Sequence, residues 1–92
     1  MSYLIGDIGN TSIKLSILNN KFNIKKTYNL ATKKIFNKNF KHWFFKKIIT
    51  NEIDKKILFS SVVPKAFLEI KKYLSKKKFK VIELKELKIR SI

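Results

Sequence analysis

One short stretch near the N-terminus combines residue types that bind charged ligands. Residues 7–14 run Asp-Ile-Gly-Asn-Thr-Ser-Ile-Lys, and Gly6 and Gly9 beside Asp7 are the two glycines of the chain. A glycine turn lets backbone N–H groups approach and cradle an anion, and Asn10 and Thr11 add side-chain donors. A carboxylate beside such a turn suits a hard divalent cation. The stretch therefore predicts a site for the phosphates of a nucleotide and their Mg²⁺.

The same residues also have a simpler structural interpretation. Gly9 and Asn10 are common turn residues, so the stretch is equally compatible with a β-hairpin in which Asp7 caps local backbone groups. Lys14 is one of many lysines in the chain and by itself is typical of a solvated strand residue. Short glycine motifs often match by chance, so the spacing alone leaves both interpretations open.

The elements that would position this stretch form an antiparallel meander. Residues 3–8 are a mostly apolar run that ends at Gly9, which is typical of a buried strand. Residues 12–18 alternate between apolar and polar side chains, and residues 22–30 predict a third, more exposed strand. The Asn19-Asn20 pair predicts a tight hairpin turn between them, because asparagine tolerates a positive φ.

After this meander the hydrophobic period changes to that of a helix. Asn37 or Asn39 is a candidate N-cap for this helix. The apolar side chains at helical spacing predict a buried stripe, made up of Phe40, Trp43, Phe44 and Ile48. His42 lies beside this stripe and is expected to be exposed, since no second histidine or cysteine accompanies it to bind a metal.

The remaining segments predict a strand, a helix and a last strand. Residues 56–63 are a compact apolar run, and Pro64 suits the first turn of the helix that follows. The apolar stripe of that helix is Phe67, Ile70 and Leu74. Lys65 and Glu69 are at i and i+4 in the sequence, so they are expected to form an ion pair on the solvent-exposed side of this helix. With residues 79–84 as a strand, the order β-β-β-α-β-α-β predicts an α/β fold with a mixed five-stranded sheet.

Length and charge limit the functional classes. The chain has 92 residues, enough for one small domain, and its 22 Lys and Arg against 6 Asp and Glu produce a formal net charge of +16. We interpret this charge as a compositional bias, because the lysines are scattered and Arg90 is the sole arginine, whereas phosphate recognition favours the arginine fork. We therefore expect no specific nucleic-acid partner. The chain has no cysteine and no apolar run of about 20 residues, so we expect a cytoplasmic protein that spans no membrane.

Two motifs resemble one known family. The opening Asp-Ile-Gly-Asn-Thr-Ser-Ile-Lys resembles the first phosphate-binding motif of the actin/hexokinase/Hsp70 ATPase superfamily, and more narrowly the Asp-x-Gly-Asn-Thr opening of type III pantothenate kinases. Residues 59–64, Phe-Ser-Ser-Val-Val-Pro, resemble a second segment of the same family. Two matches at the right separation are more specific than one, and the resemblance covers essentially the whole chain. It implies a ribonuclease-H-like/actin-like ATPase lobe.

The resemblance also implies a function and a set of site residues. Family members use ATP to phosphorylate pantothenate to 4'-phosphopantothenate in coenzyme A biosynthesis. Carried over, the ATP phosphates would be bound by Asp7, Gly9, Asn10, Thr11, Ser12 and Lys14. Asp7 would also bind Mg²⁺, directly or through water, and Ser60 and Ser61 would lie near the cleft. The family further implies a homodimer and a monovalent cation, K⁺ or NH₄⁺.

The sequence departs from the family in one large respect. A Gly-x-Asp-Arg segment, which carries the catalytic base and pantothenate contacts, and a second phosphate motif, Asp-x-Gly-Thr, are both missing from the 92 residues. We therefore assign no catalytic residue in this chain. We expect residues 1–84 to form the N-terminal ATPase lobe and residues 85–92 to begin the connection to a missing C-terminal lobe. The chain alone is then expected to be inactive.

Three other functions on related folds compete with this one: a nuclease, an accessory or regulatory protein, and a nucleic-acid-binding module. Ribonuclease-H-like nucleases need a second acid at the end of the fourth strand, where this chain has serines at positions 60 and 61. A non-catalytic accessory or regulatory protein on the same fold remains an alternative, as does a nucleic-acid-binding module. The best support for the latter is the interleaving of aromatics and lysines in residues 41–47, although helical spacing favours a core position for Trp43.

Overall fold

The computed structural model describes residues 1–84 and places the expected elements in the expected order. The strands are β1 (Ser2–Ile8), β2 (Ser12–Leu18), β3 (Ile24–Ala31), β4 (Ile53–Ser61) and β5 (Lys80–Glu83). The helices are the 3₁₀ helix η1 (Thr32–Phe36), α1 (Lys38–Ile48) and α2 (Pro64–Lys76). The connection expected at residues 85–92 lies outside the described residues.

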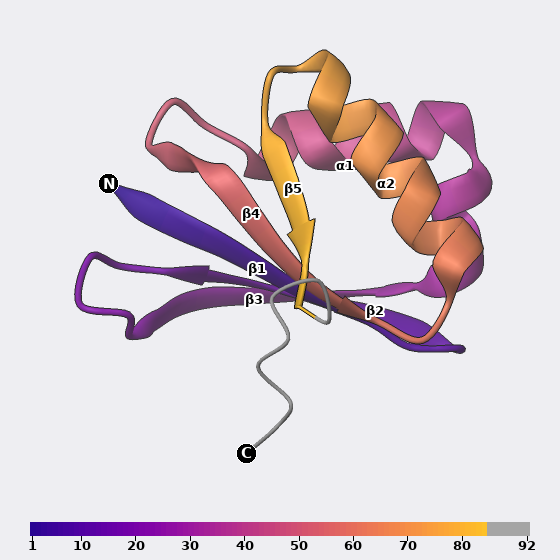
Figure 1. The fold of residues 1–92 in the computed structure, drawn as a ribbon, viewed down its shortest axis with the longest axis horizontal. Helices are drawn as coiled ribbons and strands as arrows, with labels where there is room; N and C mark the ends of the chain where they lie inside the picture. Colours follow the sequence, from indigo (N-terminus) through magenta and orange to yellow (C-terminus); the bar gives the residue numbers. More distant parts are fainter. Residues whose placement is uncertain (85–92) are drawn as a thin grey trace.

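Within residues 1–84 the strands form one mixed five-stranded sheet in the order β3-β2-β1-β4-β5 (Figure 1). β1 pairs antiparallel with β2, and β2 pairs antiparallel with β3. On its other side β1 pairs parallel with β4, which pairs parallel with β5. The central strand β1 is therefore the point where the sheet changes from antiparallel to parallel pairing, and the predicted α/β fold class is confirmed.

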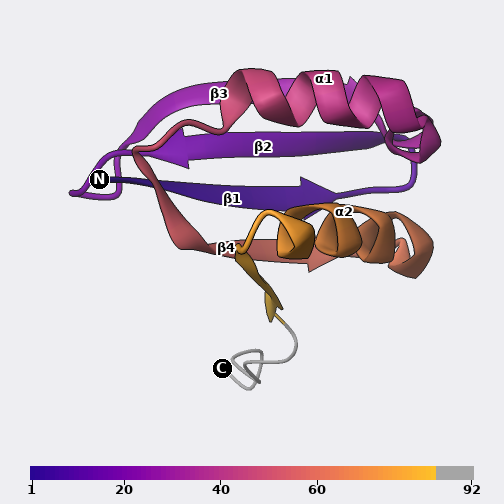
Figure 2. The ribbon, with the colours of Figure 1, turned by 90° about the horizontal axis from the view of Figure 1, so that it is seen from above.

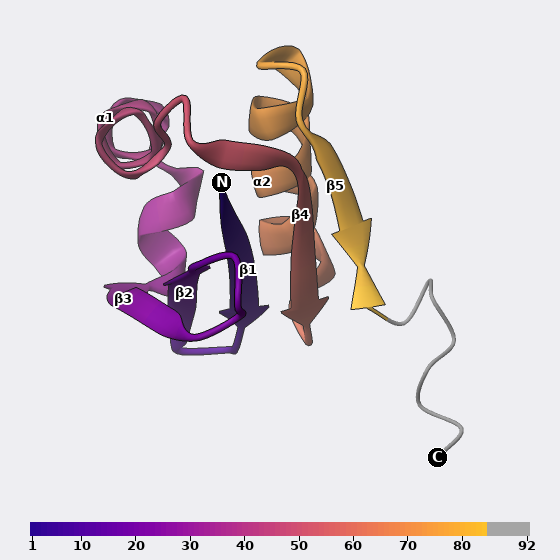
Figure 3. The ribbon, with the colours of Figure 1, turned by 90° about the vertical axis from the view of Figure 1, so that its left-hand side faces the viewer.

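Both α-helices pack on the same face of the sheet. Seen from above, α1 lies over β3 and β2 and α2 lies over β4 (Figure 2), and the view along the sheet shows both helices on one side (Figure 3). The core between the layers includes Leu4, Leu15, Phe45, Phe59 and Ile70, each at most 1% exposed. No helix in the described part covers the opposite face, which we call the open face. No helix among residues 1–84 is long and apolar enough to cross a membrane.

The start of α1 follows the sequence prediction, but its buried face differs from it. The Phe40 N–H donates to Asn37 Oδ1 at 2.8 Å, so Asn37 is the N-cap. Phe44, Phe45 and Ile48 face the core, whereas Trp43 is 56% exposed and its ring lies beside the Lys47 ammonium. Because Trp43 and Phe45 flank Phe44 at 100° intervals around the helix, only one of them can share its face. The predicted core position of Trp43 is wrong.

Two further local predictions are corrected. The β2–β3 connection is longer than an Asn-Asn turn, because Asn19 Oδ1 accepts hydrogen bonds from the N–H groups of Lys21 and Asn23, and Phe22 takes the positive φ of 66°. On α2, Glu69 pairs with Lys41 of α1 at 2.9 Å instead of with Lys65. A contact between helices replaces the expected contact within one helix, since packing of α1 against α2 brings the two side chains together.

Candidate functional site

Three polar side chains lie in a row across the three central strands. Asp7 near the end of β1 is in register with Lys14 on β2 and with Ser60 on β4. Leu4 and Ile8 of β1 are buried on the helix face, so the alternation of the strand turns Asp7 toward the open face. All three side chains are exposed. Antiparallel and parallel pairing on the two sides of β1 therefore bring an acid, a base and a hydroxyl together.

These three side chains have no polar partner within the described part of the chain. Asp7, Lys14 and Ser60 form no hydrogen bond and no ion pair with residues 1–84, although cross-strand neighbours are close enough to interact. They line an open cavity of about 420 Å³, whose other walls include the apolar side chains Ile5 and Leu58. The site thus presents free polar groups above an apolar floor.

The turn between β1 and β2 is held by hydrogen bonds from the start of η1. The Gly9 N–H donates to the Ser12 carbonyl at 2.9 Å, which closes the turn. The Thr32 hydroxyl donates to the Gly9 carbonyl at 2.7 Å, and the Thr32 N–H donates to the Thr11 carbonyl at 3.0 Å. Thr32 is 3% exposed. The turn is therefore fixed by a buried residue that lies 23 positions away from Gly9 in the sequence.

Two adjacent backbone N–H groups of this turn have no hydrogen-bond partner among residues 1–84. The backbone N–H groups of Asn10 and Thr11 donate no hydrogen bond to the described residues, and the side chains of Asn10, Thr11 and Ser12 are exposed. Adjacent unpaired N–H groups in a turn form a concavity that attracts oxyanions. The predicted residues of the turn are thus brought beside Asp7 and Lys14, at the same end of the sheet.

The two glycines serve packing and have no unusual backbone angle. Neither has a positive φ, so the close approach of the backbone at Gly9 does not depend on a left-handed conformation. A Cβ atom at Gly9 would lie 3.2 Å from the Ser12 carbonyl oxygen, so the tight turn itself favours glycine there. A Cβ atom at Gly6 would overlap the ring of Phe59, which is fully buried and packs edge-to-face on Phe67.

Sequence reasoning missed Thr32 and could not separate Ser60 from Ser61. A threonine at the end of a strand carries no signal that its partner is a distant glycine carbonyl. Ser61 closes a local turn: its hydroxyl donates to the Val63 carbonyl at 3.1 Å and accepts from the Val63 N–H at 3.0 Å. The two serines therefore differ in their contacts: Ser61 stabilises the local turn, and Ser60 is the one that lies beside Asp7.

Comparison with known proteins places the chain in a family. A family model described as type III pantothenate kinase matches residues 3–91. The chain is 38% identical over 90 residues to a type III pantothenate kinase of Pelagibacter ubique (strain HTCC1062). The chain belongs to the type III pantothenate kinase family. That match covers 97% of this chain but 36% of the relative, so the chain spans about a third of the relative's length.

A solved structure shows the same fold. The chain superposes with a TM-score of 0.59 on a ROK family protein from Streptococcus pneumoniae TIGR4 in complex with sucrose, at 21% identity. The superposition covers 90% of this chain and 34% of the other. At this identity the likeness shows the fold alone, which for this type III pantothenate kinase family member is the mixed five-stranded sheet with its helices.

The donor set at Asp7 fits one kind of metal ion. Residues 1–84 contain no cluster of three or more His, Cys, Asp or Glu side chains. Mg²⁺ in phosphate sites is commonly held by one or two carboxylates, with phosphate oxygens and water as its other ligands. A single carboxylate beside an anion-binding turn fits that arrangement. Glu52 and Asp54 lie at the opposite end of the sheet, where Ser2 pairs with Ile53.

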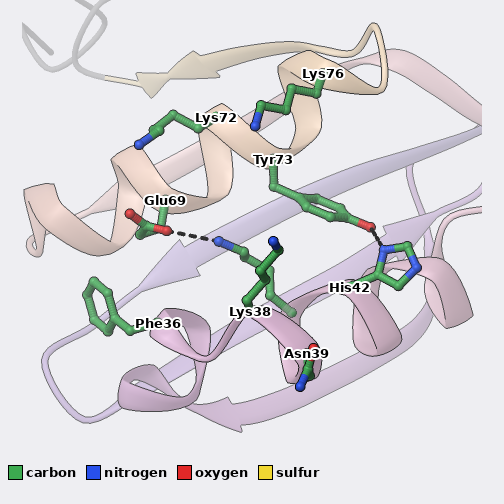
Figure 4. A pocket seen from close by; sticks show the side chains of 9 residues that line it. Phe36, Lys38, Asn39, His42, Glu69, Lys72, Tyr73 and Lys76 are labelled. Atoms are coloured by element: carbon green, nitrogen blue, oxygen red, sulfur yellow. Dashed lines mark hydrogen bonds and ion pairs between the residues drawn. The ribbon is translucent and has the colours of Figure 1, made fainter.

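A second cavity lies between the helices, on the far side of the sheet from Asp7. It has a volume of about 450 Å³ and is crossed by the Lys41–Glu69 ion pair (Figure 4). His42 Nδ1 lies 3.1 Å from the Tyr73 hydroxyl along the same groove, and His42 is exposed as predicted. Burial raises the pKa of Tyr73. In this family member these contacts join α1 to α2, and the groove is separate from the turn at residues 9–12.

Proposed function

We propose that this chain is the nucleotide-binding lobe of a type III pantothenate kinase. The complete enzyme would transfer the γ-phosphoryl group of ATP to the hydroxyl of pantothenate, which produces 4'-phosphopantothenate for coenzyme A synthesis. The observation that carries the proposal is the uncommitted Asp7–Lys14 pair beside a turn with free N–H groups, in a chain of this family. Residues 1–84 correspond to the proposed lobe.

Each group of the site has a proposed task in binding the nucleotide. The N–H groups of Asn10 and Thr11, with the side chains of Asn10, Thr11 and Ser12, would donate to phosphate oxygens. Lys14 would add a positive charge that can follow the phosphate as charge moves in the transition state. Asp7 would hold Mg²⁺, directly or through water, and the ion when bound neutralises phosphate charge. Gly9 keeps the turn tight enough for this approach.

The reaction itself needs one group that residues 1–84 do not place at the site. When the pantothenate hydroxyl oxygen bonds to the γ-phosphorus, the bond to the bridging oxygen of ADP breaks and the hydroxyl proton must pass to a base. Asp7 is assigned to the metal, and Glu69 is paired with Lys41 on the helix face. We therefore propose that polypeptide outside this chain supplies the base. A homodimer, a monovalent cation (K⁺ or NH₄⁺) and a cytoplasmic location belong to the same proposal.

Nucleotide binding by the 92-residue chain tests the lobe assignment directly. We expect Mg·ATP to shift the amide signals of residues 7–14 in an NMR titration. Lys14→Ala should weaken binding about tenfold, the amount expected when a hydrogen bond to a charged group is lost. Asp7→Asn should weaken it by about the same factor, because the amide is a poorer ligand for Mg²⁺ than the carboxylate. The matched control is Lys46→Ala on the exposed side of α1, which should bind Mg·ATP like the unchanged chain.

Two further measurements separate binding from catalysis. In EDTA, Asp7→Asn should bind ATP at least as well as the unchanged chain, because the carboxylate repels phosphate when no cation lies between them. The chain alone should not phosphorylate pantothenate, whereas activity should appear when it is joined to the unmatched part of the Pelagibacter relative. Absence of ATP binding by the unchanged chain would contradict the proposed function.

A further inference from the structure

The geometry points to Ser60 as a third side chain of the phosphate site: we propose that its hydroxyl donates a hydrogen bond to a phosphate oxygen of the bound nucleotide. The inference rests on the proposed function, because it assumes that the phosphates lie over the turn at residues 9–12. It extends the site from the β1–β2 turn across to β4, and it separates Ser60 from its neighbour Ser61.

Position is the first argument. Ser60 is the register partner of Asp7 on the parallel strand β4, so the two side chains leave the sheet on the same face. The alternation of β4 agrees, since Phe59 is fully buried under the helices and Ser60 is exposed on the open face. The Val62 N–H donates to the Ile8 carbonyl at 3.0 Å, which pins the end of β4 to the end of β1. Ser60 is therefore held firmly beside Asp7.

The second argument is that Ser60 has no other task in the described structure. Its hydroxyl forms no hydrogen bond with residues 1–84, whereas the Ser61 hydroxyl is fully used in the turn to Val63. The hydroxyl of Ser16, which lies on the same face of the sheet and lines the same cavity, is 3.4 Å from the Thr27 hydroxyl. Ser60 lines the cavity that also contains Asp7 and Lys14.

The third argument concerns chemistry and reach. Neighbouring strands are about 4.8 Å apart, so Lys14 and Ser60 stand on opposite sides of Asp7 and can contact an anion held above it from both sides. In open sheets, ligands bind at the carboxyl ends of the parallel strands where the strand order reverses, and β1 and β4 end together at this place. A neutral hydroxyl at Ser60 donates to phosphate without adding the repulsion that a second carboxylate would bring.

The serine pair offers a matched test in the 92-residue chain. Titration with Mg·ATP should show that Ser60→Ala weakens binding about three- to tenfold, the range for one hydrogen bond, and that Ser60→Thr restores it. Ser61→Ala should leave Mg·ATP affinity within about twofold and lower the unfolding midpoint instead, because its turn to Val63 is lost. Adenosine, which lacks phosphates, should bind the unchanged chain and Ser60→Ala equally.

A charge substitution at Ser60 distinguishes a role in ligand binding from a merely structural role, because only the former predicts a change in Mg·ATP and Mn²⁺ binding. Ser60→Asp places a carboxylate beside Asp7, so it should weaken Mg·ATP binding more than tenfold and strengthen binding of Mn²⁺ alone, measured by paramagnetic broadening. If Ser60→Ala and Ser60→Asp bind Mg·ATP like the unchanged chain while Asp7→Asn weakens it, the role of Ser60 is wrong and the lobe assignment stands. If the unchanged chain itself binds no ATP, the proposed function fails and this inference fails with it.

Discussion

At the scale of single residues, the site is built from side chains whose neighbours leave them free. Asp7, Lys14 and Ser60 share one row of the sheet and make no contact that would compete with a ligand. Thr32 shows the opposite case, since both its hydroxyl and its N–H are used to hold the turn. The proposed binding residues therefore differ from the supporting residue Thr32 in their hydrogen-bond partners, because Thr32 has partners within residues 1–84 and they have none.

Thr32 permits a prediction about the support of the turn. Thr32→Val keeps the shape of the side chain but leaves the half-buried Gly9 carbonyl without its donor, which should cost about 0.5–1.5 kcal/mol of unfolding free energy. Thr32→Ser keeps the donor and should cost less. Urea unfolding measures the stability, and exchange of the Gly9 amide, which closes the turn, measures the turn. Equal protection of this amide in Thr32→Val and the unchanged chain would show that the hydroxyl does not hold the turn.

At the scale of elements, a contact between helices α1 and α2 replaces the one that was expected within α2, between Lys65 and Glu69. Lys41 and Glu69 form an ion pair at 2.9 Å, and His42 contacts Tyr73 across the same groove. The edge of β3 is covered by the same helix layer, because Tyr28 packs edge-to-face on Phe44. The helix layer is thus tied together over the sheet while the open face keeps the polar row accessible.

The Lys41–Glu69 pair leads to a prediction about pH. The hydrogen bond from Lys41 and its positive charge lower the pKa of Glu69 below its usual 4.5. Because the pKa of Glu69 is lower in the folded state than in the unfolded state, the pair stabilises the folded state above about pH 4.5. This contribution is lost as the pH falls through the pKa of the folded state. Glu69→Gln should therefore be less stable than the unchanged chain at pH 6, and the difference should shrink toward pH 3.

The measurement is the urea midpoint of both proteins across this pH range. Glu52→Gln provides a control, since Glu52 is exposed and forms no ion pair within residues 1–84. A Glu69→Gln deficit that stays constant down to pH 3 would mean that the pair acts through packing and not through charge. High salt should reduce the deficit at pH 6, because ions screen an exposed pair.

At the scale of the whole molecule, the length of the chain bears on how much of a family member it spans, and its charge bears on attraction to polyanions. The chain spans about a third of its Pelagibacter relative, and its described part is a single lobe with one face covered by helices. The net charge of +16 is spread along the sequence. Among residues 1–84, lysine ammonium groups lie near aromatic rings at Lys26, Lys34, Lys47, Lys55, Lys71 and Lys77. Spread charge predicts general attraction to polyanions and no defined recognition surface.

Nucleic-acid binding tests this interpretation of the charge. We expect the chain to bind two unrelated DNA duplexes with affinities within about threefold of each other, and to lose more than tenfold in affinity between about 50 and 200 mM salt. Fluorescence anisotropy measures both effects. A strong preference for one sequence, or binding that persists at high salt, would instead favour the nucleic-acid-binding alternative.

Much of the fold and the site could be predicted from local sequence patterns. The alternation of β2, the apolar run of β4 and the α1 cap depend on neighbours a few residues apart. The order of the elements along the chain was therefore predicted correctly, and the N-cap was narrowed to two asparagines, of which Asn37 is the one. The turn after Asp7 could be predicted for the same reason, because its glycine and polar residues are contiguous in the sequence. The bounds of β3 and the face of α1 that is buried were less accurate, since packing partners decide both.

The sequence by itself determined the fold class, the position of the Asp7 turn and, through two motifs, the family, because each is encoded in contiguous residues. The tertiary structure alone decided that Ser60 and not Ser61 lies beside Asp7, that Thr32 holds the Gly9 turn, and that Gly6 makes room for Phe59. These facts depend on strand register and on contacts between segments far apart in the chain. A shift of one residue in register would turn Ser60 to the other face of the sheet, and no local pattern specifies which register is formed.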